Sequence, residues 1–447
     1  MNGRRLWPEA RMAWPRLAEW QLSALLLYVA AAFLLPKGNA SAVVFYACVL
    51  PCLLARLAVP PSARWRDAGV VLALGLVVWS ALTLLWGEGG AHRAGQFAAD
   101  SLATLGFVLS LVLTLDAPWA RVWLARVLIW AGCVNAAVAI VRGSLLPPVE
   151  TLDPRLWGWA ISTHPILGSM VMTTAYLTAL ARGLSGRGAR WPNFASAAVM
   201  AIFILMCESR GPIAASALAT LFLAAGAQWR WRLLAGAGIF VALWLLLPAA
   251  VHDHVLAVLT RRGASHRLDI WAATLGQIRQ RPWSGHGLGA QMHLAIGGQD
   301  ITFPHDLYLS LLYYSGAVGL ALFVALAGVL AARLARTWDS EAPWLAAMGL
   351  AVLVGGLTDL GQVTKGPGPM WLILWVPVGF MLGWWRDAAK KKQFFFEKKN
   401  QKTFFRLSSA SPRQPRKRFC RFFLKRSAFV CFKAPPETIS RRSFRFD

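Results

Sequence analysis

The sequence predicts an all-α polytopic membrane protein, with about 12 transmembrane helices and one large outer loop that contains an amphipathic helix. Hydrophobic residues make up 57% of the 447-residue chain and charged residues only 15%, whereas charged residues are about a quarter of a typical soluble protein. Apolar runs of membrane-spanning length recur along the chain, and arginines gather in alternate loops between them. These observations exclude a soluble globular protein.

The spans are predicted from runs of about 20 apolar residues, which are long enough to cross a bilayer as helices. The candidate runs lie near residues 18–36, 40–58, 68–86, 96–115, 120–142, 162–182, 193–208, 211–227, 231–250, 306–332, 342–360 and 369–386. Only Ser209 and Arg210 separate the runs 193–208 and 211–227. This pair is therefore either a tight hairpin or one broken helix.

The orientation is predicted from the positive residues, because cytoplasmic loops carry the excess of Lys and Arg. With the N-terminus inside, the inner loops hold Arg56, Arg64, Arg66, Arg121, Arg182, Arg187, Arg190, Arg230, Arg232, Arg333, Arg336 and Arg386. The domains are then a cytoplasmic N-terminus (1–17), nine spans (18–250), an outer loop (251–305), three spans (306–386) and a tail (387–447). We expect both termini to be cytoplasmic.

The C-terminal tail has a composition of its own. From Lys390 onward it carries 18 Lys or Arg and three acidic residues, and it contains neither Gly nor Trp. A basic, Phe-rich segment of this kind can lie on an anionic membrane surface. The abrupt change of composition favours the alternative, a disordered extension or a non-native sequence made by translation past a natural stop or in a shifted frame.

Polar residues concentrate in the outer loop and the start of the next run, at about 252–316. Six of the eight histidines lie there: His252, His254, His266, His286, His293 and His305. His252 and His254 flank Asp253, but no H-E-x-x-H motif, paired cysteines or carboxylate cluster accompanies them. A serine hydrolase is disfavoured because no Gly-x-Ser-x-Gly motif occurs. We therefore expect no metal and no cofactor.

The loop is predicted to contain a helix with Ser265 as its N-cap and Pro282 beyond its end. Its apolar residues recur at helical spacing: Leu268, Trp271, Leu275 and Ile278. Arg267 falls in the first turn, where its guanidinium and the free backbone amides can face a phosphate. The alternative is an interfacial helix whose arginines only touch lipid headgroups. A glycine-rich turn at Gly285 to Gly289 follows and is weak evidence for phosphate binding.

Arg210 lies between two apolar runs, where an unpaired guanidinium is costly and a functional role is the default interpretation. The alternative is a structural ion pair with Glu208. His305 follows Pro304 and opens the tenth span, so it is expected at the membrane boundary. A histidine there can act as a general base for a hydroxyl nucleophile. The alternative is an interfacial histidine that hydrogen-bonds a carbonyl.

Several motifs, in this order, resemble the O-antigen ligase and polymerase superfamily. They are Glu208-Ser-Arg-Gly-Pro, Arg267-Leu-Asp-Ile-Trp, the Gly285-x-Gly-x-Gly turn, and His305-Asp-Leu-Tyr-Leu followed by Ser315-Gly. The resemblance covers roughly residues 20–386. It implies a glycosyltransferase of the bacterial inner membrane. Such an enzyme moves a polysaccharide from undecaprenyl diphosphate to lipid A-core at the periplasmic face, without metal or nucleotide.

Carried over to this chain, the resemblance makes Arg210 and Arg267 the diphosphate-binding cations and His305 the base. It makes the outer loop periplasmic. Further candidate contacts to the substrate are Arg142, Arg155, Arg261, Arg262 and Lys365. Two residues depart from the family's pattern: Asp306 stands where Asn is common, and Tyr314 where an acidic residue is common.

The partners implied are an undecaprenyl-diphosphate-linked O-antigen, lipid A-core and membrane lipids, with no nucleic acid. Alternatives within the superfamily are an O-antigen polymerase and a protein O-oligosaccharyltransferase. A lipid-linked glycan transporter is an alternative of another class. It would need ionisable residues near the bilayer midplane, and the main polar residues inside the spans are Asp100 and Asn135.

Overall fold

The computed structural model of the protein describes residues 7–36, 40–58, 66–145, 155–186, 189–225, 266–296 and 299–387. The chain divides into two units, residues 1–389 and 390–447, and the described residues all belong to the first. The predicted span 231–250, the histidines His252 and His254, and the basic tail lie outside the described residues.

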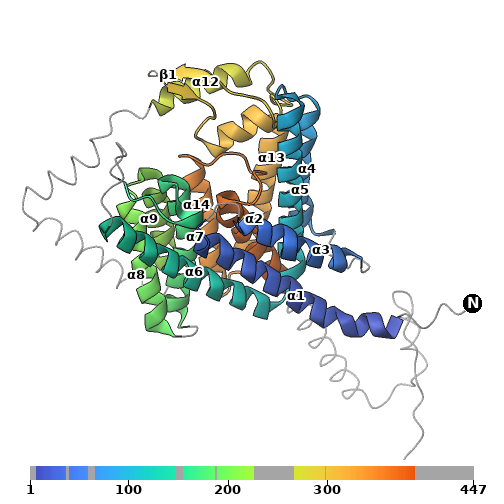
Figure 1. Ribbon diagram of the computed structural model, residues 1–447, viewed down its shortest axis with the longest axis vertical. Helices are drawn as coiled ribbons and strands as arrows, with labels where there is room; N and C mark the ends of the chain where they lie inside the picture. The colour runs from blue at the N-terminus through green and yellow to red at the C-terminus, as the bar shows by residue number, and fades with distance from the viewer. Residues whose placement is uncertain are drawn as a thin grey trace, which may run out of the picture. The chain divides into compact units, whose positions relative to one another are not determined.

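The described part is almost entirely helical (Figure 1). The helices are α1 (Trp7–Leu34), α2 (Ala40–Val44), η1 (Phe45–Val49), α3 (Leu50–Leu57), α4 (Ala68–Leu82), η3 (Thr83–Leu85), α5 (Gly90–Thr114), α6 (Pro118–Leu145), η4 (Ala160–Ser162), α7 (Pro165–Ser185), α8 (Arg190–Met206), α9 (Arg210–Ala225), α12 (Arg267–Ile278), α13 (Leu307–Arg336), α14 (Ala342–Gly356) and η5 (Trp371–Trp375). A two-stranded antiparallel hairpin, β1 (Leu294–Ile296) and β2 (Gln299–Ile301), was not predicted. The all-α class is confirmed.

A helix coincides with each predicted span that lies within the described residues, whereas the predicted span 231–250 lies outside them. Six helical segments are long and apolar enough to cross a membrane: Arg16–Leu34, Ala40–Leu57, Ala68–Leu85, Gly90–Thr114, Pro118–Leu145 and Leu307–Arg336. Helices α8, α9 and α14 are apolar but shorter. The count of about 12 spans therefore stays a prediction.

The closely spaced pair of runs forms two helices, α8 and α9, joined by a short corner at Cys207, Glu208 and Ser209. Both helices pack against α7, and α9 also packs against α14. Glu208 turns the chain with a left-handed φ of 46°. Arg210 is thereby placed at the first position of α9, on the corner itself.

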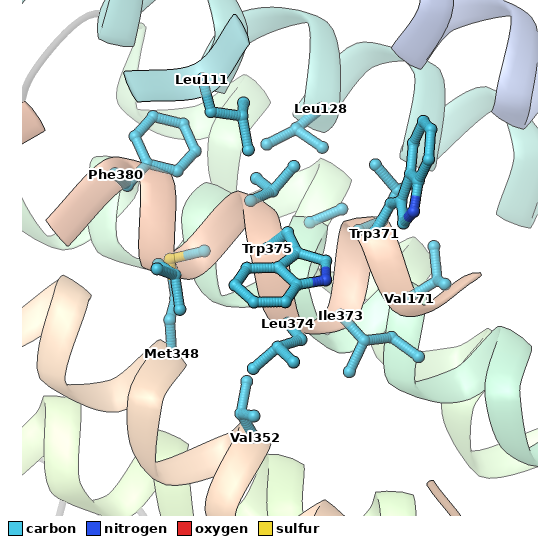
Figure 2. Packing of buried hydrophobic residues seen from close by; sticks show 14 of the residues in the cluster. Leu111, Leu128, Val171, Met348, Val352, Trp371, Ile373, Leu374, Trp375 and Phe380 are labelled. Atoms are coloured by element: carbon cyan, nitrogen blue, oxygen red, sulfur yellow. The ribbon is translucent and has the colours of Figure 1, made fainter. Parts of the chain in front are cut away.

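A core of large aromatic side chains joins the first helices to the last (Figure 2). Trp371 and Trp375 of η5 are fully buried. The Trp371 ring stacks on Phe107 of α5 with 4.3 Å between centroids, and its indole nitrogen donates to Thr104 Oγ1 at 2.9 Å. Apolar packing and the hydrogen bond of the Trp371 indole thus hold η5 against α5.

Ion pairs gather at one end of the helices. Arg121 contacts Asp387 at 3.2 Å, and Arg386 contacts Asp116 at 2.8 Å. Arg333, near the end of α13, contacts Asp67 at 3.0 Å. Asp67 also caps α4 by accepting from two backbone amides. The arginines predicted on the inner side are therefore partly engaged in pairs that tie helix ends together.

At the other end, α13 is interrupted at Gly316, whose backbone is non-helical with φ 66° and ψ −172°. The segment before α13 docks into this break. Its amides at His286 and Gly287 donate to the carbonyls of Tyr313 and Tyr314 at 2.7 and 3.1 Å. In return, Ala317 donates its amide to the Pro282 carbonyl at 2.8 Å. The loop and α13 thus supply hydrogen-bond partners for each other's backbone amides and carbonyls.

The glycine-rich turn forms this junction, and its glycines are needed for close packing. A side chain at Gly285 would meet Gly316 and Tyr314 backbone atoms within 2.7 Å, and one at Gly287 would meet the Gly87 Cα at 2.4 Å. Both glycines have positive φ. The Ser315-Gly motif and the glycine turn are thus two halves of one backbone contact.

We predict that Gly316→Ala destabilises the protein by roughly 1–3 kcal/mol, because its φ and ψ lie in a region essentially restricted to glycine. The new Cβ would also lie 2.1 Å from the Trp283 carbonyl oxygen. The measurement is thermal unfolding of the purified protein in detergent. Gly328→Ala on the same helix is the control, since nothing lies within 4 Å of its Cβ. Equal stability of the two variants would contradict the assignment.

Candidate functional site

His305 and Asp359 form the centre of the site. His305 Nδ1 donates to Asp359 Oδ1 at 2.5 Å, and the His305 ring packs on Phe303 with 3.8 Å between centroids. Asp359 is only 5% exposed, whereas the His305 side chain is 27% exposed. The carboxylate holds the ring by Nδ1 and leaves Nε2 as the nitrogen that can take a proton from a substrate.

Asp359 was not among the residues predicted from the sequence. It lies three residues beyond the end of α14, and 54 residues after His305. The only signal in the sequence is a single carboxylate at the outer end of the run 342–360. Its partner depends on the packing of α13 and α14, which periodicity does not reveal.

Asp306 caps α13: its carboxylate accepts the Leu309 amide at 2.8 Å. Burial raises the pKa of this carboxyl above its ordinary value, while backbone amides and the charge of Arg267 act in the opposite direction. Asp306 is therefore a helix cap beside the histidine. Asn, which is common at this position in the family, is an equally good N-cap.

Arg267 is the first residue of α12, as predicted, but the cap differs. The N-cap is His266, with φ 47° and no side-chain cap hydrogen bond, so the expected Ser265 cap is wrong. Helix α12 packs against α13, which begins two residues after His305. The first turn of α12 has no side-chain cap hydrogen bond, so its backbone amides are left for other acceptors.

The buried face of α12 also differs from the prediction. Ile270, Thr274 and Ile278 face inward, whereas Leu268 is 76% and Leu275 44% exposed. Of the predicted apolar stripe, Leu268 and Leu275 are thus exposed, Trp271 is half-buried and Ile278 is buried. Exposed leucines on an outer-loop helix suit a membrane surface, and the interfacial and phosphate-binding interpretations are compatible for this helix.

Arg210 is brought towards the same place by the packing of α9 on α14. Gly211 lies against Thr358, and a Cβ at Gly211 would be 2.1 Å from the Thr358 hydroxyl. Thr358 is the neighbour of Asp359 in the chain. Arg210, next to Gly211 and classed as exposed, therefore lies at the rim of the His305–Asp359 pair.

Two of the further candidate arginines lie at the outer ends of α6 and α8. Arg155 acts electrostatically on Cys207, and the Leu156 amide donates to the Met206 carbonyl at 3.1 Å. The Arg155 segment thus lines the corner that carries Arg210. The Arg142 guanidinium lies 5.2 Å above the Trp159 ring.

Lys365 is exposed in the loop that also carries Asp359. Arg261 and Arg262 lie outside the described residues. The structure therefore joins His305 to Asp359 and places the start of α9, which carries Arg210, beside the neighbouring Thr358. Arg155 lies near the same corner, and Arg267 opens α12, which packs on α13. The structure does not place Arg142 or Lys365 in contact with the histidine.

Backbone strain gathers at these positions. The described non-glycine residues with positive φ are Ala160, Glu208, His266 and His305. Three of them are the histidine itself or lie within two residues of Arg210 and Arg267. Such conformations cost of order 1–3 kcal/mol each and often occur at functional sites.

The other described histidines of the stretch have structural contacts. His286 stacks on Tyr313 and is hydrogen-bonded to the Gln277 carbonyl at 2.9 Å. His293 pairs with Asp300 at 2.9 Å. Within the described residues no group of three His, Cys, Asp or Glu side chains is arranged to hold a metal ion.

Comparisons with known proteins show a family similarity. A family model described as O-antigen ligase matches residues 195–324, which include Arg210, Arg267 and His305. A curated O-antigen ligase from Pseudomonas aeruginosa is 28% identical over 315 residues, covering 68% of this chain and 74% of that protein. Over residues 195–324 the chain is thus similar to the O-antigen ligase family.

This similarity and the apolar helices support a multi-pass membrane protein. A second relative, monocarboxylate transporter 11 of Mus musculus, is 28% identical over 258 residues. It matches 55% of this chain, and the chain spans about half (51%) of that transporter's length. Asp359 lies beyond the residues that the family model matches, whereas the residues predicted from motifs lie within them.

We predict that Asp306→Ala destabilises the protein by about 1 kcal/mol, the cost of losing a helix N-cap. Asp306→Asn should retain the cap and hence the stability. Thermal unfolding in detergent compares the two variants with the wild type. Equal losses for Ala and Asn would show that the charge of Asp306, rather than capping, matters.

Proposed function

We propose that the protein transfers O-antigen polysaccharide from undecaprenyl diphosphate to a sugar hydroxyl of lipid A-core. The observation that carries this proposal is the His305–Asp359 pair, with the arginines Arg210 and Arg267 at its rim. A base for a hydroxyl and cations for a diphosphate are what this reaction requires. The family similarity supports the substrates, because O-antigen ligases act in the same pathway.

In the proposed reaction, His305 Nε2 removes the proton of the acceptor hydroxyl as its oxygen attacks the anomeric carbon of the donor sugar. The bond between that carbon and the diphosphate oxygen breaks, and undecaprenyl diphosphate leaves. Asp359 is a positioning residue, since it holds the His305 ring by Nδ1 and stabilises the protonated imidazole. The residues present supply base, orientation and positive charge without a cofactor.

The arginines act on the leaving group. A guanidinium stays charged and its planar fork matches phosphate oxygens. Fixed positive charge near a departing diphosphate lowers the barrier, because it stabilises charge that develops in the transition state. Arg155 is a further diphosphate candidate through its proximity to the Arg210 corner, and Arg142, Arg261, Arg262 and Lys365 remain candidates for contacts to the glycan or headgroups.

We infer that this site faces the periplasm and that the termini are cytoplasmic. Support comes from the distribution of charged residues. The ion-paired arginines Arg121, Arg333 and Arg386 lie at helix ends opposite those that carry His305, as the positive-inside rule requires of a cytoplasmic end.

A transporter would use polar residues inside the spans, and Asn135 is one of the two main residues of this kind. Its contacts argue against such a use. Its amide donates to the Phe33 and Trp159 carbonyls at 2.6 and 2.9 Å, and its oxygen accepts from Ser162 at 2.6 Å. Asn135 is thus fully occupied in helix packing.

The proposal is tested by reconstituting the protein with an undecaprenyl-diphosphate glycan and either lipid A-core or a second lipid-linked glycan. Extension of lipid A-core is expected. Extension of only the second glycan would identify a polymerase, and movement of intact donor across the membrane without transfer would identify a transporter.

We predict that His305→Ala lowers the rate of transfer by roughly 10²–10⁴-fold, the usual contribution of a general base. Asp359→Asn should lower it by at least about tenfold, because an amide favours the wrong histidine tautomer. The readout is transfer of labelled glycan in proteoliposomes with matched protein amounts. Wild-type rates in either variant would overturn the assigned role.

We predict that Arg210→Ala and Arg267→Ala each lower transfer by roughly 10²-fold, the scale of losing one charge-stabilising donor. The Lys variants should recover only part of this rate, since an ammonium lacks the fork. Arg336→Ala at the opposite end of α13 is the control. Full activity of the Lys variants would argue against a forked contact to the diphosphate.

A further inference from the structure

The helix ends opposite His305 carry a cleft that the proposed glycan transfer does not use. It lies between the first half of α6, the end of α7 and the first turns of α8. These three helices pack against one another (Figure 1). Its volume is about 570 Å³. The residues that decide its chemistry are Arg126, Ile129, Trp130, Arg182, Asn193 and Ser196.

The polar side of this cleft is basic. Arg126 and Arg182 contribute two guanidinium groups, and Asn193 adds an amide. None of the described residues that line the cleft is acidic. Positive charge with neutral donors, and without a lining carboxylate, favours an anionic ligand.

Arg126 differs from the other arginines at this end. Arg121 and Arg333 are tied to carboxylates, whereas Arg126 makes no ion pair with any described residue. Its guanidinium instead lies 4.9 Å above the Trp123 ring and is exposed. A cation–π contact orients the group and leaves its N–H donors directed to the surroundings.

The other side of the cleft is apolar and continues onto the lipid-facing surface. Ile129 and Trp130 line it, and Trp123 and Trp130 are 49% and 56% exposed. Trp123 lies little more than one turn inside the start of α6, a depth typical of the lipid headgroups, and Trp130 lies about two turns deeper, towards the acyl chains. An amphiphile with a phosphate and acyl chains fits such a divided surface better than a soluble anion does.

We propose that this cleft binds the phosphate headgroup of an anionic phospholipid from the leaflet opposite the glycan-transfer site. Arg126 and Arg182 hold the phosphate, Asn193 contacts the headgroup, and Ile129 and Trp130 contact the first part of the acyl chains. Basic pockets between membrane helices on the cytoplasmic side bind anionic lipids by the same physics. The site is separate from the diphosphate site, because it lies at the other ends of α6 and α7.

The test is native mass spectrometry of the full chain in detergent, titrated with phosphatidylglycerol or phosphatidylcholine of identical acyl chains. The wild type should retain phosphatidylglycerol in preference to phosphatidylcholine. Arg126→Gln should weaken phosphatidylglycerol binding roughly fivefold, the scale expected for one basic residue at an anionic lipid, and Arg126→Lys should weaken it less. Arg336→Gln is the matched control, since Arg336 is exposed at the same end and does not line the cleft.

Three outcomes would overturn the proposal. Equal losses in the Arg126→Gln and Arg336→Gln variants would show only a general attraction of surface charge. Equal retention of the two lipids by the wild type would show that the headgroup is not recognised. Displacement of phosphatidylglycerol by millimolar inorganic phosphate would identify a soluble phosphate as the ligand. Asn193→Ala provides a second variant, and unchanged binding there together with Arg126→Gln would also exclude the cleft.

Discussion

The structure depends on one constraint: a backbone amide or carbonyl that leaves its helix inside a membrane protein must find another partner. Gly316 interrupts α13 and so releases the carbonyls of Tyr313 and Tyr314 from their usual partners. The loop segment before α13 supplies the amides of His286 and Gly287, and its own Pro282 carbonyl takes the Ala317 amide. This exchange fixes the outer loop to a helix, and with it the start of α13, where His305 is held.

Charge is divided between the two ends of the helices. At one end, arginines pair with aspartates and join helix termini, so their desolvation is offset within the protein. At the other end, the chain next to Arg210 lies against Thr358, the neighbour of the buried Asp359 that contacts His305. In the proposed transfer, the arginines at this end act on the diphosphate, whereas those at the opposite end join helix termini.

The sequence predicted the helical class and the positions of the described helices, because hydropathy is a local signal; the roles of His305, Arg210 and Arg267 stay predictions from motif order. It did not predict Asp359, whose role depends on the docking of α13 and α14, or the β1–β2 hairpin. The Ser265 cap and the buried face of α12 were wrong, since Ile270 and Thr274 pack inward instead of Leu268 and Leu275. Periodicity finds an amphipathic helix, but where two faces carry apolar residues, tertiary packing decides which is buried.

The His305–Asp359 hydrogen bond has a consequence for how the protein is synthesised and folded. Its two residues belong to segments that leave the ribosome in sequence, and both arginines and the histidine precede the aspartate. Until α14 has been inserted and packed on α9 and α13, the histidine has no carboxylate to set its tautomer. A partly synthesised chain already in the membrane therefore holds His305 without the carboxylate that fixes its ring, and this hydrogen bond forms only when the last helices have packed.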